Sequence, residues 1–130
     1  MIKYLGSKRT LIPVLSQLGQ ASGANTALDL FTGTTRVAQA FKKLGMTVTA
    51  SDVASYAECF GKTWIELDAD SANRSELALA LAELESLPGE AGYFTQKFCV
   101  EARYFQPKNG ERVDAIREKI ESDYRDSWLY

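Results

Sequence analysis

The stretch Leu28-Asp29-Leu30-Phe31-Thr32-Gly33-Thr34-Thr35 decides the fold that we expect from this sequence. Residues 26–31 are a short, largely apolar run, which is typical of a strand in a parallel sheet that is covered on both faces. Residues 32–35 predict a tight turn around a glycine. In residues 36–44 the apolar side chains recur at helical spacing, and Gly45 is placed to end that helix.

A second strand and helix follow directly. Residues 46–51 alternate in polarity and are rich in β-branched side chains, which predicts a strand that ends before Asp52. Residues 53–67 predict an amphipathic helix, whose apolar stripe would be Tyr56, Phe60, Trp64 and Leu67. Residues 26–67 therefore predict a βαβα unit of the α/β class, with parallel strands and a right-handed crossover.

The flanking segments are predicted to be mainly helical. Residues 8–18, 75–87 and 107–124 each have helical periodicity. The apolar residues that share one face are Leu11, Val14, Leu15 and Leu18 in the first helix and Val113, Ile116, Ile120 and Tyr124 in the last. Residues 91–106 hold five aromatic side chains without a regular period, so we assign no element there and expect poor order. The predicted division is a core over residues 1–70 and a helical segment over residues 71–130.

Composition excludes several kinds of chemistry. The chain has no histidine, which excludes histidine-based acid–base catalysis, Ser-His-Asp and Cys-His systems, and histidine-ligated zinc. Its two cysteines, Cys59 and Cys99, cannot form a four-ligand metal site by themselves, and we expect both to be small packing residues. Charged residues interrupt every apolar run and the start of the chain lacks a secretory signal, so we expect no membrane span and a cytoplasmic protein.

Charge is distributed unevenly along the chain. Residues 1–65 have 7 Lys and Arg against 3 Asp and Glu, a net charge of +4, whereas residues 66–130 have 8 against 14, a net charge of −6. A basic half and an acidic half suit a protein that meets an anionic ligand on one side only. The alternative is a random scatter of charge over a solvated surface.

The turn and Asp52 together suggest a nucleoside ligand. A turn after a parallel strand opens a crevice at the carboxyl end of the strand, and the helix beyond it offers free N–H groups. Gly33 is the only glycine of the turn, so the pattern is neither a Walker loop nor Gly-x-Gly-x-x-Gly, and a plain structural turn is the alternative. Asp52 follows Asp29 by 23 residues, where an acid can accept both ribose hydroxyls or, alternatively, cap the next helix.

A third segment, Lys3-Tyr4-Leu5-Gly6-Ser7-Lys8, makes the pattern specific. Followed by Asp29-Leu30-Phe31-Thr32-Gly33 and then Ser51-Asp52, it resembles the start of Dam-like N6-adenine-specific DNA methyltransferases over about residues 1–67. A weaker likeness continues over residues 105–121. The resemblance implies part of a Rossmann-like, S-adenosyl-L-methionine-dependent methyltransferase core and DNA as the partner. The alternatives are part of a methyltransferase for RNA or a small molecule, and a non-catalytic nucleoside-binding or protein-interaction module.

The resemblance also implies a set of cofactor contacts and no metal ligand. The implied contacts are Tyr4, Lys8, Asp29, Phe31, Thr32, Gly33, Asp52 and Val53. Lys8 would neutralise the methionine carboxylate, Asp52 would bind the ribose, and Val53 would lie against the adenine, with residues 29–33 beneath the methionine part. The sequence departs from the family at Thr35, where the family has a second glycine. We expect this β-branched residue to resist a positive φ and to hold the backbone away from the cofactor.

The residues that would perform the transfer are not found. The family's catalytic tetrad, Asp-Pro-Pro-Tyr or a close variant, has adjacent prolines, and the prolines of this chain are Pro13, Pro88 and Pro107. We therefore assign no catalytic residue. The sequence predicts the cofactor-binding part of a longer enzyme, inactive by itself, and we interpret the aromatic end at Trp128 and Tyr130 as a cut through that enzyme. Nothing in the sequence indicates the oligomeric state.

Overall fold

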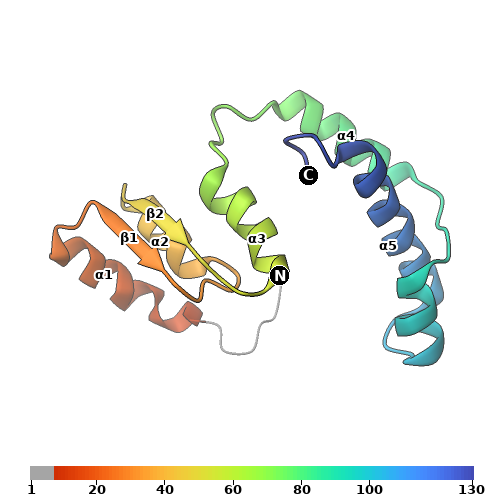
Figure 1. The fold of residues 1–130 in the computed structure, drawn as a ribbon, viewed down its shortest axis with the longest axis horizontal. Helices are drawn as coiled ribbons and strands as arrows, with labels where there is room; N and C mark the ends of the chain where they lie inside the picture. Colours follow the sequence, from red (N-terminus) through yellow and green to blue (C-terminus); the bar gives the residue numbers. More distant parts are fainter. Residues whose placement is uncertain (1–7) are drawn as a thin grey trace. The chain divides into compact units, whose positions relative to one another are not determined.

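The computed structural model describes residues 8–130. The chain forms two compact units, the first ending at Ala72 and the second comprising Asn73–Tyr130 (Figure 1). The sequence predicted a cofactor-binding core over residues 1–70 and a helical segment over residues 71–130. The assignment of cofactor binding to the first of these segments stays a prediction. Within the described residues, no helix is both long and apolar enough to cross a membrane.

The first unit is built on two parallel strands. β1 (Thr26–Asp29) pairs with β2 (Thr47–Ala50), in a register that sets the first residues of the two strands opposite each other. α2 (Arg36–Lys43) connects them and contacts both. The predicted strand–helix–strand order and the parallel pairing are confirmed, and Gly45 ends the α2 segment at a φ of 82°. The unit is thus mixed α/β, with a small sheet.

The core of this unit lies around α2. Val37, Ala38 and Ala40 of this helix are buried. α1 (Ile12–Ser22) follows a 3-10 turn at Lys8–Leu11 and packs against α2. Gly19 permits this approach, because a Cβ there would lie only 3.0 Å from the ring of Phe41.

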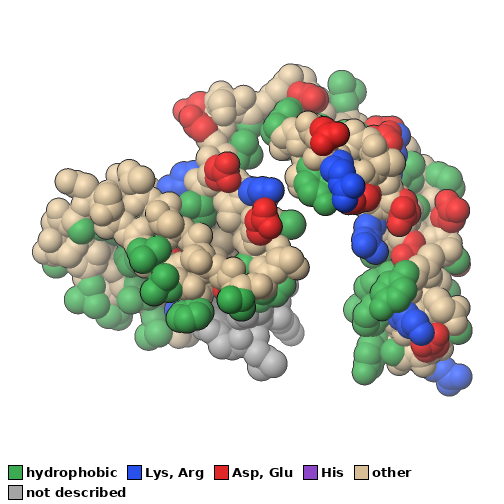
Figure 2. Space-filling view, viewed as in Figure 1, with side chains coloured by type: hydrophobic (Ala, Val, Ile, Leu, Met, Phe, Trp, Pro, Cys, Tyr) green, Lys and Arg blue, Asp and Glu red, His purple; other side chains and the backbone are tan. Residues whose placement is uncertain are grey.

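Most of the apolar stripe predicted for residues 8–18 is on the surface. Leu11, Val14 and Leu18 are each more than half exposed, and so are Leu28 and Leu30 at β1. α1 meets α2 through the side that carries Gly19, and Leu15, one turn before Gly19 on that side, is the half-buried member of the stripe. Hydrophobic side chains gather on this part of the surface in Figure 2.

The helix after β2 also buries less than predicted. α3 (Ser55–Gly61) continues as a π-helical turn, Lys62–Glu66. Its buried residue is the small Ala57, whereas Tyr56 and Trp64 of the predicted apolar stripe are largely exposed. Cys59 is exposed as well, so its expected packing role is wrong; Cys99, in the second unit, is buried as predicted. A cavity lies between β2 and residues 57–66.

The second unit is helical. α4 (Arg74–Ser86) is followed by a π-helix, Thr95–Glu101, then by α5 (Pro107–Lys119) and a second π-helical turn, Ile120–Tyr124. The segment for which the sequence predicted poor order therefore contains a helix, and this helix packs against α5. The two come together at Gly110, where a Cβ would lie 2.9 Å from the hydroxyl of Thr95.

A buried carboxylate fixes the start of that π-helix. Asp114 of α5 is only 5% exposed, although the apolar stripe predicted for this helix did not include it. Its carboxylate accepts hydrogen bonds from the backbone N–H groups of Gly92, Phe94 and Thr95 at 2.8–2.9 Å and from the Thr95 hydroxyl at 2.7 Å. Burial alone would raise the pKa of Asp114, but these hydrogen bonds outweigh it and lower the pKa to about 2.

Polar side chains fasten α4 to the later helices. Glu83 of α4 forms an ion pair with Lys119 at 2.7 Å and accepts a hydrogen bond from the Tyr124 hydroxyl at 2.6 Å. About two turns nearer the start of α4, Glu76 accepts a hydrogen bond from the indole N–H of Trp128 at 2.9 Å. Glu76 and Glu83 of α4 therefore pair with donors of the second unit itself.

Candidate functional site

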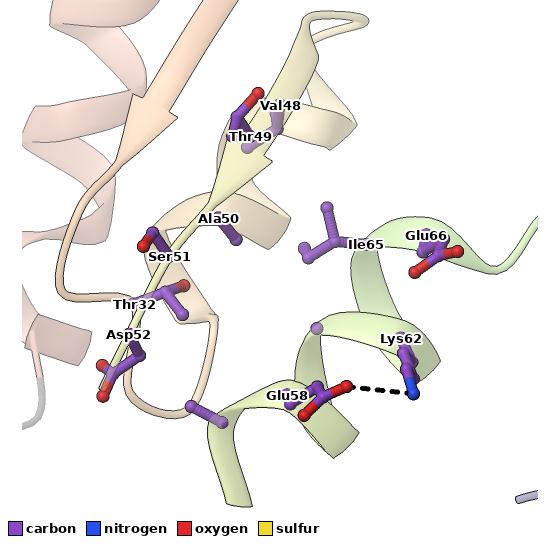
Figure 3. A pocket seen from close by; sticks show the side chains of 12 residues that line it. Thr32, Val48, Thr49, Ala50, Ser51, Asp52, Glu58, Lys62, Ile65 and Glu66 are labelled. Carbon is purple, nitrogen blue, oxygen red and sulfur yellow. Dashed lines mark ion pairs between the residues drawn. The ribbon is translucent and has the colours of Figure 1, made fainter. Parts of the chain in front are cut away.

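The turn after β1 and the end of β2 meet at one edge of the sheet. The backbone N–H of Ser51 donates to the carbonyl of Asp29 at 2.8 Å, and that of Thr32 donates to the carbonyl of Ser51 at 3.1 Å. Beyond these ladder-like bonds, the N–H of Gly33 donates to Asp52 Oδ2 at 2.8 Å. The prediction that the turn and Asp52 share one edge is confirmed, and Figure 3 shows Thr32, Ser51 and Asp52 side by side.

The Asp52 carboxylate is held by backbone N–H groups. Its Oδ1 accepts from Ala54 at 3.0 Å, and its Oδ2 accepts from Gly33. These two hydrogen bonds hold the pKa of Asp52 below its ordinary value, and the bond from Ala54 has the larger effect. The N-cap of α3 is Ala54, so the alternative in which Asp52 caps this helix is wrong. Because a carboxylate has about four acceptor positions, the Asp52 carboxylate can accept further hydrogen bonds from a ligand.

Lys8 reaches this edge from the beginning of the described chain. Its ammonium donates to the carbonyl of Phe31 at 3.2 Å, and its charge contributes to the lowered pKa of Asp52. The side chains of Phe31 and Val53 are 73% and 97% exposed, so neither packs within the unit. Tyr4, the remaining implied contact from the first segment, lies outside the described residues.

Asp29 behaves differently from the other predicted contacts. Its carboxylate is buried, and Oδ2 accepts from the Thr32 hydroxyl at 3.0 Å and from the N–H of Ala38 at 3.2 Å. Asp29 is therefore directed into the turn and toward the first turn of α2.

Thr35 corrects the expectation for the turn. It takes a φ of 58°, close to the 51° of Gly33, although it is β-branched. Its fully buried hydroxyl donates to the Thr34 carbonyl and accepts from the Gln39 side chain, both at 2.8 Å, and its N–H donates to Thr32 at 2.7 Å. These hydrogen bonds offset the cost of the left-handed backbone, so this threonine takes the left-handed conformation that a glycine would adopt.

A cavity of about 600 Å³ opens beside Asp52, between β2 and α3 (Figure 3). Its volume is in the range of small-molecule sites. Its lining residues are Thr32, Val48, Thr49, Ala50, Ser51, Asp52, Ala57, Glu58, Gly61, Lys62, Ile65 and Glu66. The lining residues that follow Asp52 were not among the predicted site residues. The signal that could have pointed to them is the four-residue spacing of Glu58 and Lys62, which pair at 3.1 Å.

The arrangement supplies groups that can bind a ligand. It brings together a carboxylate with open acceptor positions, an ammonium group, and a turn whose backbone is fixed at both ends. Among residues 8–130, no cluster of three or more acidic, cysteine or histidine side chains is placed to hold a metal ion. These groups are suited to a ligand that has hydroxyl donors near one carboxylate and an anionic group near Lys8.

Comparisons with known proteins agree on one family. A family model described as D12 class N6 adenine-specific DNA methyltransferase matches residues 4–130. The type II methyltransferase M.NlaIII of Neisseria lactamica is 30% identical over 129 residues, which covers 92% of this chain and 38% of the relative. The modification methylase StsI of Streptococcus sanguinis is 30% identical over 133 residues, covering 93% of this chain and 20% of the relative. No solved structure matches the chain significantly.

Proposed function

Because this chain belongs to the D12 class N6 adenine-specific DNA methyltransferase family, we propose that it is the cofactor-binding part of an enzyme that methylates adenine N6 in DNA. The methyl donor that we propose is S-adenosyl-L-methionine, whose sulfonium supplies the methyl group. The chain spans 38% and 20% of the length of its two curated relatives. The activity proposed here therefore belongs to a longer protein, to which this chain contributes a binding site.

The observation that carries the proposal is the Asp52 carboxylate at the end of β2. It is fixed by the N–H groups of Gly33 and Ala54, and it keeps acceptor positions for the two hydroxyls of a ribose. A carboxylate that is already oriented loses little freedom on binding. The cavity beside it, about 600 Å³, begins at Thr32 and Asp52 and is large enough for a nucleoside.

Two neighbouring residues fit the rest of the cofactor. The ammonium of Lys8 donates to the Phe31 carbonyl, and since an ammonium has three donors it can also pair with the methionine carboxylate. Val53 follows Asp52, the proposed ribose contact. It is almost fully exposed and offers an apolar surface to the adenine ring. Phe31 is also a proposed contact, because it is exposed at the turn. Tyr4 is proposed on the family resemblance.

We also propose that the two strands belong to a larger, Rossmann-like sheet. A two-stranded sheet is seldom stable alone. β1 and β2 form the whole sheet among the described residues, so each has one edge without a partner strand there. The exposed apolar residues Leu28 and Leu30 of the β1 segment suit coverage by further chain. On this proposal, the acceptors for the adenine amino group lie on such a strand, and DNA is bound by the longer protein.

Titration with S-adenosyl-L-methionine tests the cofactor site directly. In two-dimensional NMR spectra we expect the amides of Gly33 and Ala54 to shift on addition of the cofactor, with amides of the second unit unchanged. Asp52→Ala should weaken this binding, whereas Asp70→Ala, which changes an exposed aspartate of the same unit, should not. Spectra that stay unchanged at millimolar cofactor would contradict the proposal for this chain.

A further inference from the structure

Asp29 holds three parts of the first unit together. Its side-chain Oδ2 accepts from the Thr32 hydroxyl in the turn and from the N–H of Ala38 in α2. Its backbone carbonyl accepts from the N–H of Ser51 at the end of β2. With only 8% of its surface exposed, the residue is directed inward, and its contacts are within the protein.

We infer that Asp29 is a positioning residue: it sets the shape of the turn that presents Gly33 to Asp52, and it does not touch the cofactor. This inference rests on the proposed function for the site. It differs from the family resemblance, which places Asp29 among the cofactor contacts.

The route from Asp29 to the site passes through Thr32. The Thr32 side chain bonds to Asp29, its N–H to Ser51, and its carbonyl accepts from Thr35 at 2.7 Å, so the residue is fixed on three sides. Gly33 follows immediately and directs its N–H at Asp52 Oδ2. Loss of the Asp29 acceptor frees the Thr32 side chain and the N–H of Ala38, which loosens the turn at both of its ends.

The two roles for Asp29 make different demands on its charge. A direct contact with the methionine ammonium depends on a negative charge, because charge-assisted hydrogen bonds are about twice as strong as neutral ones. The positioning role depends on an acceptor oxygen at the place of Oδ2. Asparagine has such an oxygen and no charge, whereas alanine has neither. Asp29→Asn and Asp29→Ala therefore separate the two roles.

The experiment measures S-adenosyl-L-methionine affinity by NMR titration and the hydrogen exchange of the Gly33 amide in the 130-residue chain. We expect Asp29→Asn to stay within about threefold of the unaltered affinity and Asp29→Ala to lose about tenfold or more. The Gly33 amide should exchange as slowly in Asp29→Asn as in the unaltered chain, and it should exchange faster in Asp29→Ala. If Asp29→Asn loses as much affinity as Asp29→Ala while Gly33 stays protected, the aspartate contacts the cofactor and the inference is wrong.

Thr32→Val provides a second test if Asp29→Ala does not fold. It is close in shape to threonine and removes the hydroxyl that bonds to Asp29. We expect faster exchange at Gly33 and about threefold or more weaker binding. Unchanged exchange and affinity in Thr32→Val would overturn the inference. If the unaltered chain fails to bind S-adenosyl-L-methionine, the proposed function fails for this chain, yet the exchange rates at Gly33 still decide whether Asp29 positions the turn.

Discussion

The backbone N–H of Gly33 lies 2.8 Å from Asp52 Oδ2, so a hydrogen bond joins the turn after β1 to the end of β2 across 19 residues of sequence. This bond orients the carboxylate before any ligand arrives. It also makes the two residues that we assign to cofactor binding dependent on each other. A substitution at either one should therefore change both the local backbone and the affinity for a ribose.

The first prediction concerns Asp52. Since two hydroxyl hydrogen bonds to a charged acceptor are lost, we expect Asp52→Ala to lower S-adenosyl-L-methionine affinity by about tenfold to a hundredfold. Asp52→Asn, which keeps one acceptor oxygen, should fall between Asp52→Ala and the unaltered chain. Calorimetry or NMR titration measures the three affinities.

The control for this series is Asp70→Ala, an exposed aspartate of the same unit. It should leave both the affinity and the Gly33 amide shift unchanged. Equal affinities for the unaltered chain and Asp52→Ala would mean that the carboxylate only organises the backbone of residues 52–54.

Local patterns in the sequence were sufficient to predict the βαβα order and the edge at which the site lies. Alternation and apolar content identified β1 and β2, Gly45 marked the end of the α2 segment, and parallel pairing then required Asp52 and the turn to meet. The left-handed Thr35 could not be predicted, because a β-branched residue disfavours this conformation. The hydrogen bonds that hold it, from its own N–H to Thr32 and from the Gln39 side chain, form only when the turn and the start of α2 are folded.

Burial was predicted less well than secondary structure, for a related reason. Periodicity shows that Leu11, Val14 and Leu18 share a face of α1, but not what covers that face, and it is exposed. In α5, apolar spacing directed attention to Val113, whereas Asp114 is the buried residue, since four hydrogen bonds from residues 92–95 replace its hydration. Such partners lie about twenty residues away and leave no local signal.

The second prediction is that the second unit loses stability in acid through Asp114. Its pKa in the folded chain is about 2, below the ordinary value of 3.8. A lowered folded pKa means that the stabilisation is fully present above about pH 4 and is lost as the pH falls from there toward 2. Thermal unfolding followed by tryptophan fluorescence should show this decline in a Trp64→Phe background, where Trp128 is the one tryptophan.

Asp114→Asn separates this group from other carboxylates. It should lower the unfolding temperature at pH 7 by about 5–10 °C, because a buried charged acceptor is replaced by a neutral one, and it should flatten the decline between pH 4 and 2. Asp126→Asn, an exposed change in the same unit, should keep both the stability and its pH dependence. An unaltered acid decline in Asp114→Asn would assign it to the other carboxylates of this unit whose pKa is lowered, Glu83, Glu101 and Asp123.

The third prediction uses the exposed Arg103, which has a φ of 58° just after the π-helix at residues 95–101. Left-handed backbone costs a non-glycine residue about 1–2 kcal/mol, and glycine avoids most of that cost. Arg103→Gly should therefore leave the second unit equally stable or more stable by up to about 1 kcal/mol. Urea unfolding measures the difference.

Arg117→Gly is the matched comparison, since it replaces an exposed arginine within α5. It should cost about 1 kcal/mol, the usual price of glycine in a helix. Arg103→Gly as destabilising as Arg117→Gly would show that the Arg103 side chain makes a contribution larger than the backbone cost.

The last prediction is that the 130-residue chain transfers no methyl group to DNA, even when S-adenosyl-L-methionine is saturating. The lone pair of adenine N6 is delocalised into the ring, so the amine is a poor nucleophile until acceptors hold it and direct it at the methyl group. We assign no such acceptors here, since the family's tetrad has adjacent prolines and this chain has only Pro13, Pro88 and Pro107. Residues 66–130, with 8 basic against 14 acidic side chains, are also a poor surface for duplex phosphates.

Incorporation of tritiated methyl groups into unmethylated DNA measures this activity, with the type II methyltransferase of Neisseria lactamica as the positive control. We expect counts from the chain to equal those from a reaction without protein, at low salt as well as high, while NMR shifts still report cofactor binding at Gly33. Incorporation that Asp52→Ala abolishes would show that residues 1–130 already contain acceptors for the adenine amino group. The assignment of those acceptors to a longer protein would then be wrong, whereas the cofactor site would stand.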